Sequence, residues 1–367
     1  MLPLNWQRVR LGDICEINPP TIIPNVFYYI DLENIEKGQL LNKQLMTKNK
    51  APSRARRLLS KNDILYQLVR PYQRNNYFFT LNGNYVASTG YAQIRTLQNP
   101  SFLYFALHSN YFVNAVLDRC EGTSYPAISS NELKKCEVIL PPLNEQSAIA
   151  NILGALDRYL CALDALILKK EGVKKALSFE LLSQRKRLKG FNQAWQRVRL
   201  GDIANYLTSN LSVEQITQQG KIKVYDVNNF IGYTDTTFIS DKPYISIVKD
   251  GSVGRVRILP PKTNILSTMG ALIANHRTTT EFLFYLLSNF DFKNFTSGSI
   301  IPHIYFKDYK EKTIFLPPLN EQSAIANILS DLDNEITSLK NKKRQFENIK
   351  KALNHDLMSA KIRVLKK

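Results

Sequence analysis

The sequence has few cysteines and no long apolar run, and both absences narrow the class of protein. Only four cysteines occur among 367 residues, and none forms a Cys-x-x-Cys pair, so neither a disulfide framework nor a zinc site is predicted. No stretch approaches 18 uncharged apolar residues, and Trp6, Arg8 and Arg10 stand where a signal peptide needs an apolar run. We therefore expect a cytoplasmic protein with no membrane segment and no bound metal.

Motifs for catalysis are also missing. Residues 251–254 read Gly-Ser-Val-Gly and lack the Gly-Lys-Ser/Thr ending of a nucleotide-binding loop. The four histidines are scattered singly, and Asp308-Tyr309-Lys310 has no second acidic ligand on a convincing preceding strand. Asn18-Pro19-Pro20-Thr21 lacks the aromatic residue with which DNA amino-methyltransferases stack a flipped base. We predict no catalytic residue and no cofactor.

The sequence has fewer acidic than basic residues. It contains 31 Asp and Glu and 49 Lys and Arg, which gives a net charge of +18. The excess of basic residues is found in each of the segments 1–142, 143–190, 191–318 and 319–367. This even distribution indicates an extended basic surface, which favours a polyanionic partner through counterion release. On charge alone, DNA, RNA, a ribosome and a membrane surface fit about equally.

The chain is a tandem repeat of two kinds of segment. Trp-Gln-Arg-Val-Arg-Leu-Gly-Asp-Ile occurs at 6–14 and at 195–203, and Leu-Pro-Pro-Leu-Asn-Glu-Gln-Ser-Ala-Ile-Ala-Asn-Ile-Leu occurs at 140–153 and at 316–329. The register of the second pair persists further on, where Lys-Lys-Ala-Leu occurs at 174–177 and at 350–353. The first pair of strings is more widely spaced, so the first variable stretch is the longer one. The order along the chain is variable, common, variable, common.

Both common segments are predicted to be helices of roughly 40 residues. A Pro-Pro pair ends the structural element before each helix, and Asn144 and Asn320 are placed as N-caps. Apolar residues then follow at alternating steps of three and four. Such stripes are typical of a coiled coil, although each helix could instead pack on its own domain. The predicted helix-pairing residues are Ile149, Ile152, Leu156, Leu163, Val173, Leu177, Ile325, Ile328, Leu332, Leu339, Phe346, Ile349 and Leu353.

The variable segments are predicted to be mixed α/β domains. Short runs of β-branched and aromatic residues, bounded by Gly, Asn and Pro, indicate strands at 63–69, 76–80, 85–87, 244–248 and 254–259. Apolar residues at helical spacing indicate helix at 102–117 and 281–288. The strand order is not predictable from these patterns.

Basic residues gather at several points in both variable segments, where arginine could pair with guanine edges and lysine with phosphate. A solvated charged face would give the same pattern. In the first segment the predicted DNA-binding residues are Lys48, Lys50, Arg54, Arg56, Arg57, Arg70, Tyr72 and Arg74. In the second they are Lys249, Arg255, Arg257 and Arg277, with Asn228 and Asn229 beside them.

The variable-common-variable-common order resembles the specificity subunit of type I restriction-modification systems. The motifs Leu-Pro-Pro-Leu-x-Glu-Gln at 140–146 and 316–322, Pro-Ser-Arg-Ala-Arg-Arg at 52–57 and Ser-Thr-Gly-Tyr at 88–91 are similar to those of that family, and the likeness covers essentially the whole chain. The second variable segment contains only a loose match to the Ser-Thr-Gly-Tyr motif of the first, so the two segments are expected to differ in specificity.

The resemblance implies an α+β fold with target-recognition domains at 1–142 and 191–318, separated by spacer helices at 143–190 and 319–367. It implies that the helices pair antiparallel as a coiled coil, which would turn the tandem repeat into a pseudo-twofold. The implied partners are double-stranded DNA, two methyltransferase subunits and restriction subunits, while the chain itself holds no catalytic centre and no S-adenosylmethionine.

Three other functions remain open at this point. The nearest is a specificity subunit that serves a fused restriction-methylation enzyme. A standalone DNA methyltransferase or nuclease with unfamiliar motifs would bind its own cofactor. A scaffold without sequence preference would give sequence-independent DNA footprints.

Overall fold

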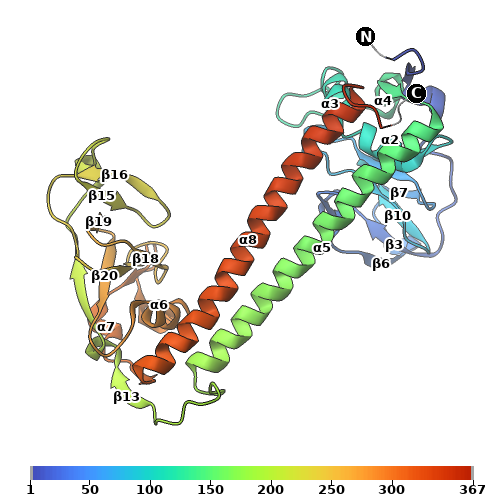
Figure 1. Cartoon of the computed structure of the whole chain (residues 1–367). Helices are drawn as coiled ribbons and strands as arrows, with labels where there is room; N and C mark the ends of the chain where they lie inside the picture. The colour runs from blue at the N-terminus through green and yellow to red at the C-terminus, as the bar shows by residue number, and fades with distance from the viewer. Residues whose placement is uncertain (1–2, 365–367) are drawn as a thin grey trace. The chain divides into compact units, whose positions relative to one another are not determined.

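A computed structural model describes residues 3–364 of the chain, which form two compact units (Figure 1). Within the described residues, unit 1 consists of residues 3–164 and 342–364, and unit 2 consists of Ala165–Asn341. The two long helices, α5 (Leu143–Leu182) and α8 (Leu319–Met358), are thus each shared between both units. Every unit therefore contains one domain and parts of both helices.

The long helices have the predicted length, since each runs for 40 residues. They begin one residue before the asparagines that were expected to cap them. The carbonyl of Pro142 accepts the backbone N–H groups of Glu145 and Gln146 at 3.0 and 2.9 Å, so the helix already starts at the proline. The side chain of Asn144 accepts the N–H of Glu145 at 2.9 Å from within the first turn.

The first domain (residues 3–142) contains two four-stranded sheets. One is antiparallel throughout and has the order β2-β11-β8-β9. The other has the order β6-β3-β10-β7, in which only β3 and β10 are parallel. The strands are β2 (Cys15–Ile17), β3 (Val26–Ile30), β6 (Gln44–Thr47), β7 (Ala55–Leu58), β8 (Ile64–Gln67), β9 (Tyr77–Phe78), β10 (Tyr85–Ser88) and β11 (Tyr91–Thr96).

Short helices and two strand pairs complete this domain. β1 (Gln7–Arg10) pairs antiparallel with β12 (Glu137–Leu140), and β4 (Ile35–Glu36) pairs with β5 (Gln39–Leu40). The helical stretch predicted at 102–117 is two helices, because the Ser109 hydroxyl accepts the N–H of Phe112 and starts a second one. The helices are α1 (Leu11–Ile14), α2 (Pro100–Ala106), α3 (Asn110–Leu117) and α4 (Ser130–Lys135).

The second domain (residues 191–318) repeats this plan with fewer strands. Its antiparallel sheet has the order β14-β20-β17-β18, and its second sheet has the order β16-β15-β19 with β15 and β19 parallel. Helix α6 (Thr280–Ser288) packs on β18 (Figure 1). The strands of the two sheets are β14 (Ala204–Thr208), β15 (Ile222–Tyr225), β16 (Phe230–Thr234), β17 (Tyr244–Val248), β18 (Val256–Leu259), β19 (Thr263–Ile265) and β20 (Met269–Ala274).

Two strand pairs flank these sheets. β13 pairs with β23 as β1 pairs with β12, and β21 pairs with β22. The remaining elements are β13 (Gln196–Arg199), β21 (Thr296–Ser297), β22 (His303–Ile304), β23 (Thr313–Leu316) and α7 (Phe306–Tyr309). The second domain is thus the same fold with one strand fewer in its parallel-containing sheet.

Within each unit the two helices run antiparallel. In unit 1, Asp157 and Asp164 of α5 form ion pairs with Lys350 and Lys343 of α8. In unit 2, Lys174 and Lys170 of α5 pair with Asp333 and Glu335 of α8. Since partner numbers rise on one helix as they fall on the other, the predicted antiparallel direction is confirmed inside each unit.

Between residues 3 and 364, no group of three or more His, Cys, Asp or Glu is placed to hold a metal ion. None of the helices in this part of the chain has the length and apolarity needed to cross a membrane.

Candidate nucleic-acid interface

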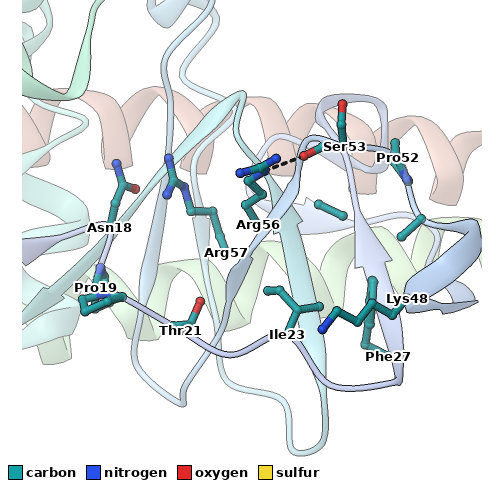
Figure 2. Close-up of a pocket in the computed structure, with 13 residues that line it drawn as sticks. Asn18, Pro19, Thr21, Ile23, Phe27, Lys48, Pro52, Ser53, Arg56 and Arg57 are labelled. Atoms are coloured by element: carbon teal, nitrogen blue, oxygen red, sulfur yellow. Dashed lines mark hydrogen bonds between the residues drawn. The ribbon is translucent and has the colours of Figure 1, made fainter.

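The first domain contains an open pocket of about 420 Å³ lined by basic and small residues (Figure 2). One wall is the loop after β2, and the other runs from the turn after β6 into β7. The pocket is lined by Asn18, Pro19, Pro20, Thr21, Ile23, Phe27, Lys48, Ala51, Pro52, Ser53, Ala55, Arg56 and Arg57. It therefore unites the Asn-Pro-Pro-Thr loop with three of the predicted DNA-binding residues.

A β-bulge presents two consecutive arginines to this pocket. Ala87 and Ser88 of β10 pair with Arg57 and Ala55 of β7, which leaves Arg56 as the extra residue. Side chains of consecutive strand residues normally point to opposite faces, but a bulge re-aims them. Figure 2 shows Arg57 between Asn18 and Arg56, with both guanidinium groups extending in the same direction.

The guanidinium group of Arg57 has one buried hydrogen-bond donor that lacks an acceptor among the described residues. This donor is the Nε–H. Burial lowers the pKa of Arg57, and the neighbouring charge of Arg56 lowers it further. A buried donor without a partner is unfavourable, so this site favours an incoming acceptor.

Both polar atoms of the Asn18 side-chain amide form hydrogen bonds within the domain. Its Oδ1 accepts the N–H of Gln93 at 3.0 Å, and its Nδ2 donates to the Ser130 hydroxyl at 2.8 Å. Asn18 also has a left-handed backbone with φ 56°. These contacts give the Asn-Pro-Pro-Thr loop a structural role as a pocket wall.

Other predicted basic residues of the first domain are held by protein groups. Arg54 forms an ion pair with Asp31 and donates to Tyr29 Oη at 3.2 Å. Arg56 Nε donates to the Ser53 carbonyl at 2.7 Å, which fixes the side chain while leaving its end exposed. Arg54 is thus paired with a carboxylate, whereas Arg56 is held by a backbone carbonyl.

The remaining predicted residues of this domain lie outside the pocket. Arg70 stacks on the Tyr125 ring with its guanidinium carbon 4.1 Å from the centroid. Arg74 donates to the His108 carbonyl at 2.9 Å and to the Asn110 amide at 2.8 Å. Tyr72 and Lys50 are exposed.

In the second domain, two predicted arginines are tied to one turn. Arg255 Nη2 donates to Asn228 Oδ1 at 3.0 Å, and Arg257 Nη1 donates to the Asn228 carbonyl at 2.9 Å. Arg257 also lies over the Tyr225 ring at 5.3 Å. The turn therefore fixes two guanidinium groups beside each other at the edge strand β18.

Of the other predicted residues of the second domain, Asn229 belongs to this turn, whereas Arg277 and Lys249 do not. Arg277 Nη2 donates to the Gln196 side chain at 3.2 Å. Lys249 makes backbone contacts to Thr268 and Ile304, next to the Gly251 turn. Asn229 donates its backbone N–H to Asp226, at 2.6 Å.

The predicted helix-pairing residues divide into three groups. Those near the helix ends pack in or against the cores of the domains, those nearer the middle are buried, half-buried or packed on the other helix, and a third group is exposed. Ile149 and Ile325 are buried in domain cores, and Leu177, Ile328 and Leu353 pack against these cores. Leu163 is buried, Phe346 packs on Tyr159 at 4.8 Å, and Leu156, Leu332 and Leu339 are half-buried. Ile152, Val173 and Ile349 are 38, 40 and 50% exposed.

The buried middle of the helices includes residues that the sequence stripe did not contain. Ile167 and Ile336 are each 6% exposed, like Leu163. Ile167 follows Leu163 by one helical turn, so a stripe shifted by one position would have included it. The apolar spacing alone does not decide between the predicted stripe and a stripe shifted by one position.

A pair of matched Trp-Glu-Arg clusters is a second feature that the sequence patterns did not reveal. In unit 1, Glu145 at the start of α5 accepts Trp6 Nε1 at 3.0 Å and Arg363 Nε and Nη2 at 3.1 and 2.8 Å. The Glu145 side chain is only 2% exposed. This cluster joins the first domain, the start of α5 and the segment after α8.

Unit 2 contains the equivalent cluster. Glu321 accepts Trp195 Nε1 at 2.9 Å and Arg187 Nε and Nη2 at 3.1 and 2.7 Å. Glu145 and Glu321 occupy equivalent positions of the repeat, and the same spacing relates Arg187 to Arg363. The repeat register could therefore have identified these arginines, but their partners belong to different repeats and no local pattern connects them.

The glutamine after each glutamate ties the helix to the domain as well. Gln146 Nε2 donates to the Pro141 carbonyl, and its Oε1 accepts the N–H of Asn99, the N-cap of α2. Gln322 makes the same two contacts, to Pro317 and to Thr279, the N-cap of α6. The Glu-Gln pairs thus dock each domain rigidly on the start of its helix.

Comparisons with known families agree with this repeated architecture. The family model of the type I restriction modification DNA specificity domain matches residues 3–170 and again residues 192–348. Together these two matches cover most of the chain, and each includes one domain with the greater part of the helix that follows it.

Two relatives with similar sequences are named as specificity subunits of type I restriction enzymes. The type I restriction enzyme MjaVIII specificity subunit of Methanocaldococcus jannaschii is 22% identical over 99% of this chain and 94% of its own length. The putative type I restriction enzyme MjaX specificity subunit of that organism is 29% identical over 65% of this chain and 62% of its own length.

Solved structures share the fold. The S subunit of a type I restriction-modification system from M. genitalium has a TM-score of 0.65 at 19% identity, over 97% of this chain and 98% of that one. A chain from a structural study of complex assembly and conformational transition of the type I R-M system has a TM-score of 0.62 at 22% identity, over 98% of both chains.

Proposed function

Because the chain belongs to the family of type I restriction-modification DNA specificity subunits, we propose that its two target-recognition domains read the two parts of one bipartite duplex target. The chain is a non-catalytic recognition subunit with a DNA-specificity role in a restriction-modification complex. The observation that carries the proposal is the duplicated domain with unequal basic surfaces. One domain has the bulged arginine pair, and the other has the Asn228 turn.

The proposed domain limits follow the repeat. Recognition domains occupy 1–142 and 191–318, and the spacer segments occupy 143–190 and 319–367. The unequal domains are proposed to read different half-sites, while the paired helices set the number of unread base pairs between them.

The proposed partners are double-stranded DNA, two methyltransferase subunits and restriction subunits. The support for two equal partners is that the helices expose matching residues at equivalent positions of the repeat. Leu143 and Leu319, for example, are 58 and 48% exposed at the start of α5 and α8. Base flipping and methyl transfer are assigned to the methyltransferase partner, so this chain selects the DNA sequence that is modified.

Methylome sequencing of cells that carry the chain with its partner subunits, and of matched cells that lack only this chain, tests the proposal. We expect a chain-dependent methylation motif with two specified parts and a gap of constant length. The purified chain should bind no S-adenosylmethionine and methylate nothing on its own. Unchanged methylation after loss of the chain, or methyl transfer by the isolated chain, would contradict the proposal.

A further inference from the structure

We propose that the pocket of the first domain is an anion site that takes one phosphate group of the DNA backbone, with the Arg57 Nε–H as its inner donor. The inference rests on the proposed function and names which residues anchor the duplex there. It also distinguishes a basic residue that positions the protein on the DNA backbone from basic residues that read bases, because a phosphate contact carries no sequence information.

The geometry of β7 is the first support. The bulge at Arg56 turns two guanidinium groups toward one pocket, where a regular strand would send one of them to each face. β7 is an edge strand of its sheet, so the bulge interrupts the pairing on one side only. Bulges of this kind at sheet edges re-aim side chains toward functional sites.

The charge of the pocket is the second support. Lys48 is the third cation of its lining, and the described lining residues include no Asp or Glu. Two neighbouring guanidinium groups repel each other, and the buried Nε of Arg57 lacks an acceptor among the described residues. A phosphate supplies both a full negative charge and acceptor oxygens, whereas a guanine edge offers partial charges only.

The site is a property of the first domain. In the second domain, the sheet with the parallel strand pair has three strands, β16, β15 and β19, and residues 191–318 include no strand in the place of β7. The edge strand β18 pairs with β17 in continuous register. The first domain is thus expected to hold the duplex through an anchor that the second domain lacks.

The test measures DNA binding by the full chain purified with its methyltransferase subunits, on a duplex that contains the methylation motif. For one phosphate contact, Arg57→Gln should reduce the slope of log K against log salt by about 0.9, which weakens binding about eightfold at 0.1 M salt and very little at 1 M. Arg57→Lys keeps the charge and should retain most of the slope. The methylation motif should stay unchanged in both variants.

The matched control is Lys351→Gln, which removes one positive charge from an exposed position of α8 in the same unit. Its salt slope and affinity should equal those of the wild type. Because Arg57→Gln could disturb the domain, the Arg57 Nε–H signal is also followed by NMR in the wild-type complex, with Arg57→Lys used to assign it. This signal should shift when the duplex is added.

Three results would overturn the inference. They are an unchanged salt slope in folded Arg57→Gln, an Arg57 Nε–H signal that does not respond to the duplex, and a motif that relaxes at one position, which would make Arg57 a base reader. Failure of the proposed function would look different, since the wild-type complex itself would then show no motif and no specific binding.

Discussion

At the scale of single residues, two buried glutamates connect the domains to the helices. A buried carboxylate is strongly destabilising unless it is paired and hydrogen-bonded. Glu145 meets this requirement through Trp6 and Arg363, and Glu321 through Trp195 and Arg187. The Leu-Pro-Pro-Leu-Asn-Glu-Gln string is thus a docking motif whose arginine partner lies far away in the chain.

Replacing Glu145 with Gln tests this role. The variant loses charge-assisted bonds to Arg363, so we expect the free energy of unfolding of unit 1 to fall by about 1.5–3 kcal/mol at pH 7. Bonds from Arg363 and then Trp6 hold the pKa of Glu145 below its usual 4.5. Its stabilisation is therefore full above about pH 4.5 and lost as the pH falls through the lower folded-state pKa, so the wild type and the variant should converge in acid.

Urea unfolding followed by tryptophan fluorescence measures this difference. The chain has two tryptophans, so in a Trp195→Phe background the remaining Trp6 reports on unit 1. The control is Glu347→Gln, which removes an exposed carboxylate of α8 and should change the stability by less than about 1 kcal/mol. Equal effects of both variants at pH 7 would contradict the assigned role of Glu145.

At the scale of secondary-structure elements, the turn at Asn228 organises the basic edge of the second domain. Replacing Asn228 with Ala removes the acceptor of Arg255 and leaves the carbonyl that holds Arg257. We expect specific DNA binding to weaken by about 1 kcal/mol, or about fivefold, and the second part of the methylation motif to lose stringency while the first part stays intact.

Asn229→Ala is the neighbouring control, because it leaves both guanidinium contacts in place. Binding assays and methylome sequencing of the two variants provide the comparison. A motif that changes in its first part, or equally in both variants, would show that this turn does not serve the second half-site.

Elements with strong local signals were predictable from sequence. The Pro-Pro pairs and long stripes indicated both 40-residue helices, and the apolar run at 244–248 matches β17 (Tyr244–Val248). The bulge in β7 and the parallel pairing of β3 with β10 were not predictable, because they depend on partners far away in the chain.

The site was predictable only in part for the same reason. Sequence singled out Arg56 and Arg57 by composition, but the orientation that distinguishes them from Arg54 arises from strand pairing and from Asp31. The helix stripe, likewise, did not reveal which apolar residues face a domain and which face the other helix. Ile149 and Leu163 both belong to the predicted stripe and both are buried, but of the two only Ile149 belongs to a domain core.

At the scale of the whole molecule, the chain passes between the units twice, and both crossings lie inside the long helices, whose length should set the gap in the target. Matched insertions of two helical turns after Ala165 and after Asn341 fall at the limits of the units. The ion pair between Asp164 and Lys343 stays on one side of the insertions, and that between Glu171 and Lys340 stays on the other.

We expect both parts of the motif to persist while the gap lengthens. Helix rises by about 1.5 Å per residue and DNA by about 3.4 Å per base pair, so about seven inserted residues correspond to roughly three base pairs, with the added rotation to be absorbed. Methylome sequencing reads the gap directly. An insertion in α5 alone is the control, since it shifts the pairing with α8 and should abolish methylation. An active double insertion with an unchanged gap would refute the spacer role.

A fragment of residues 1–190 should form a homodimer, because α5 carries the repeat equivalents of the α8 residues. Arg187 would replace Arg363 at Glu145 of the other copy, and Lys174 would replace Lys350 at Asp157. With its methyltransferase partner, the dimer should recognise an inverted repeat of the first half-site, since a twofold presents the same domain to both DNA strands.

The centre of this dimer should be weaker than in the intact chain. Lys340 of α8 is equivalent to Asp164, so Glu171 would face a carboxylate where it now has an ammonium group. Asp164→Lys in the fragment should lower the dissociation constant about tenfold, whereas Asp157→Lys should raise it. Sedimentation measures both; a folded monomer at micromolar concentration, indifferent to Asp164→Lys, would argue against this pairing.

Because unit 1 is built from both ends of the chain, its Glu145–Arg363 contact can form only at the end of synthesis. Unit 2 is one continuous segment that can be complete before translation ends, whereas Glu145 meets Arg363 only after 218 further residues. At about 5–20 residues per second this interval is roughly 10–40 s. Arg187, which is made 42 residues after Glu145, is the first matching guanidinium available during this interval, so a neighbouring nascent chain can offer it to Glu145 before Arg363 exists.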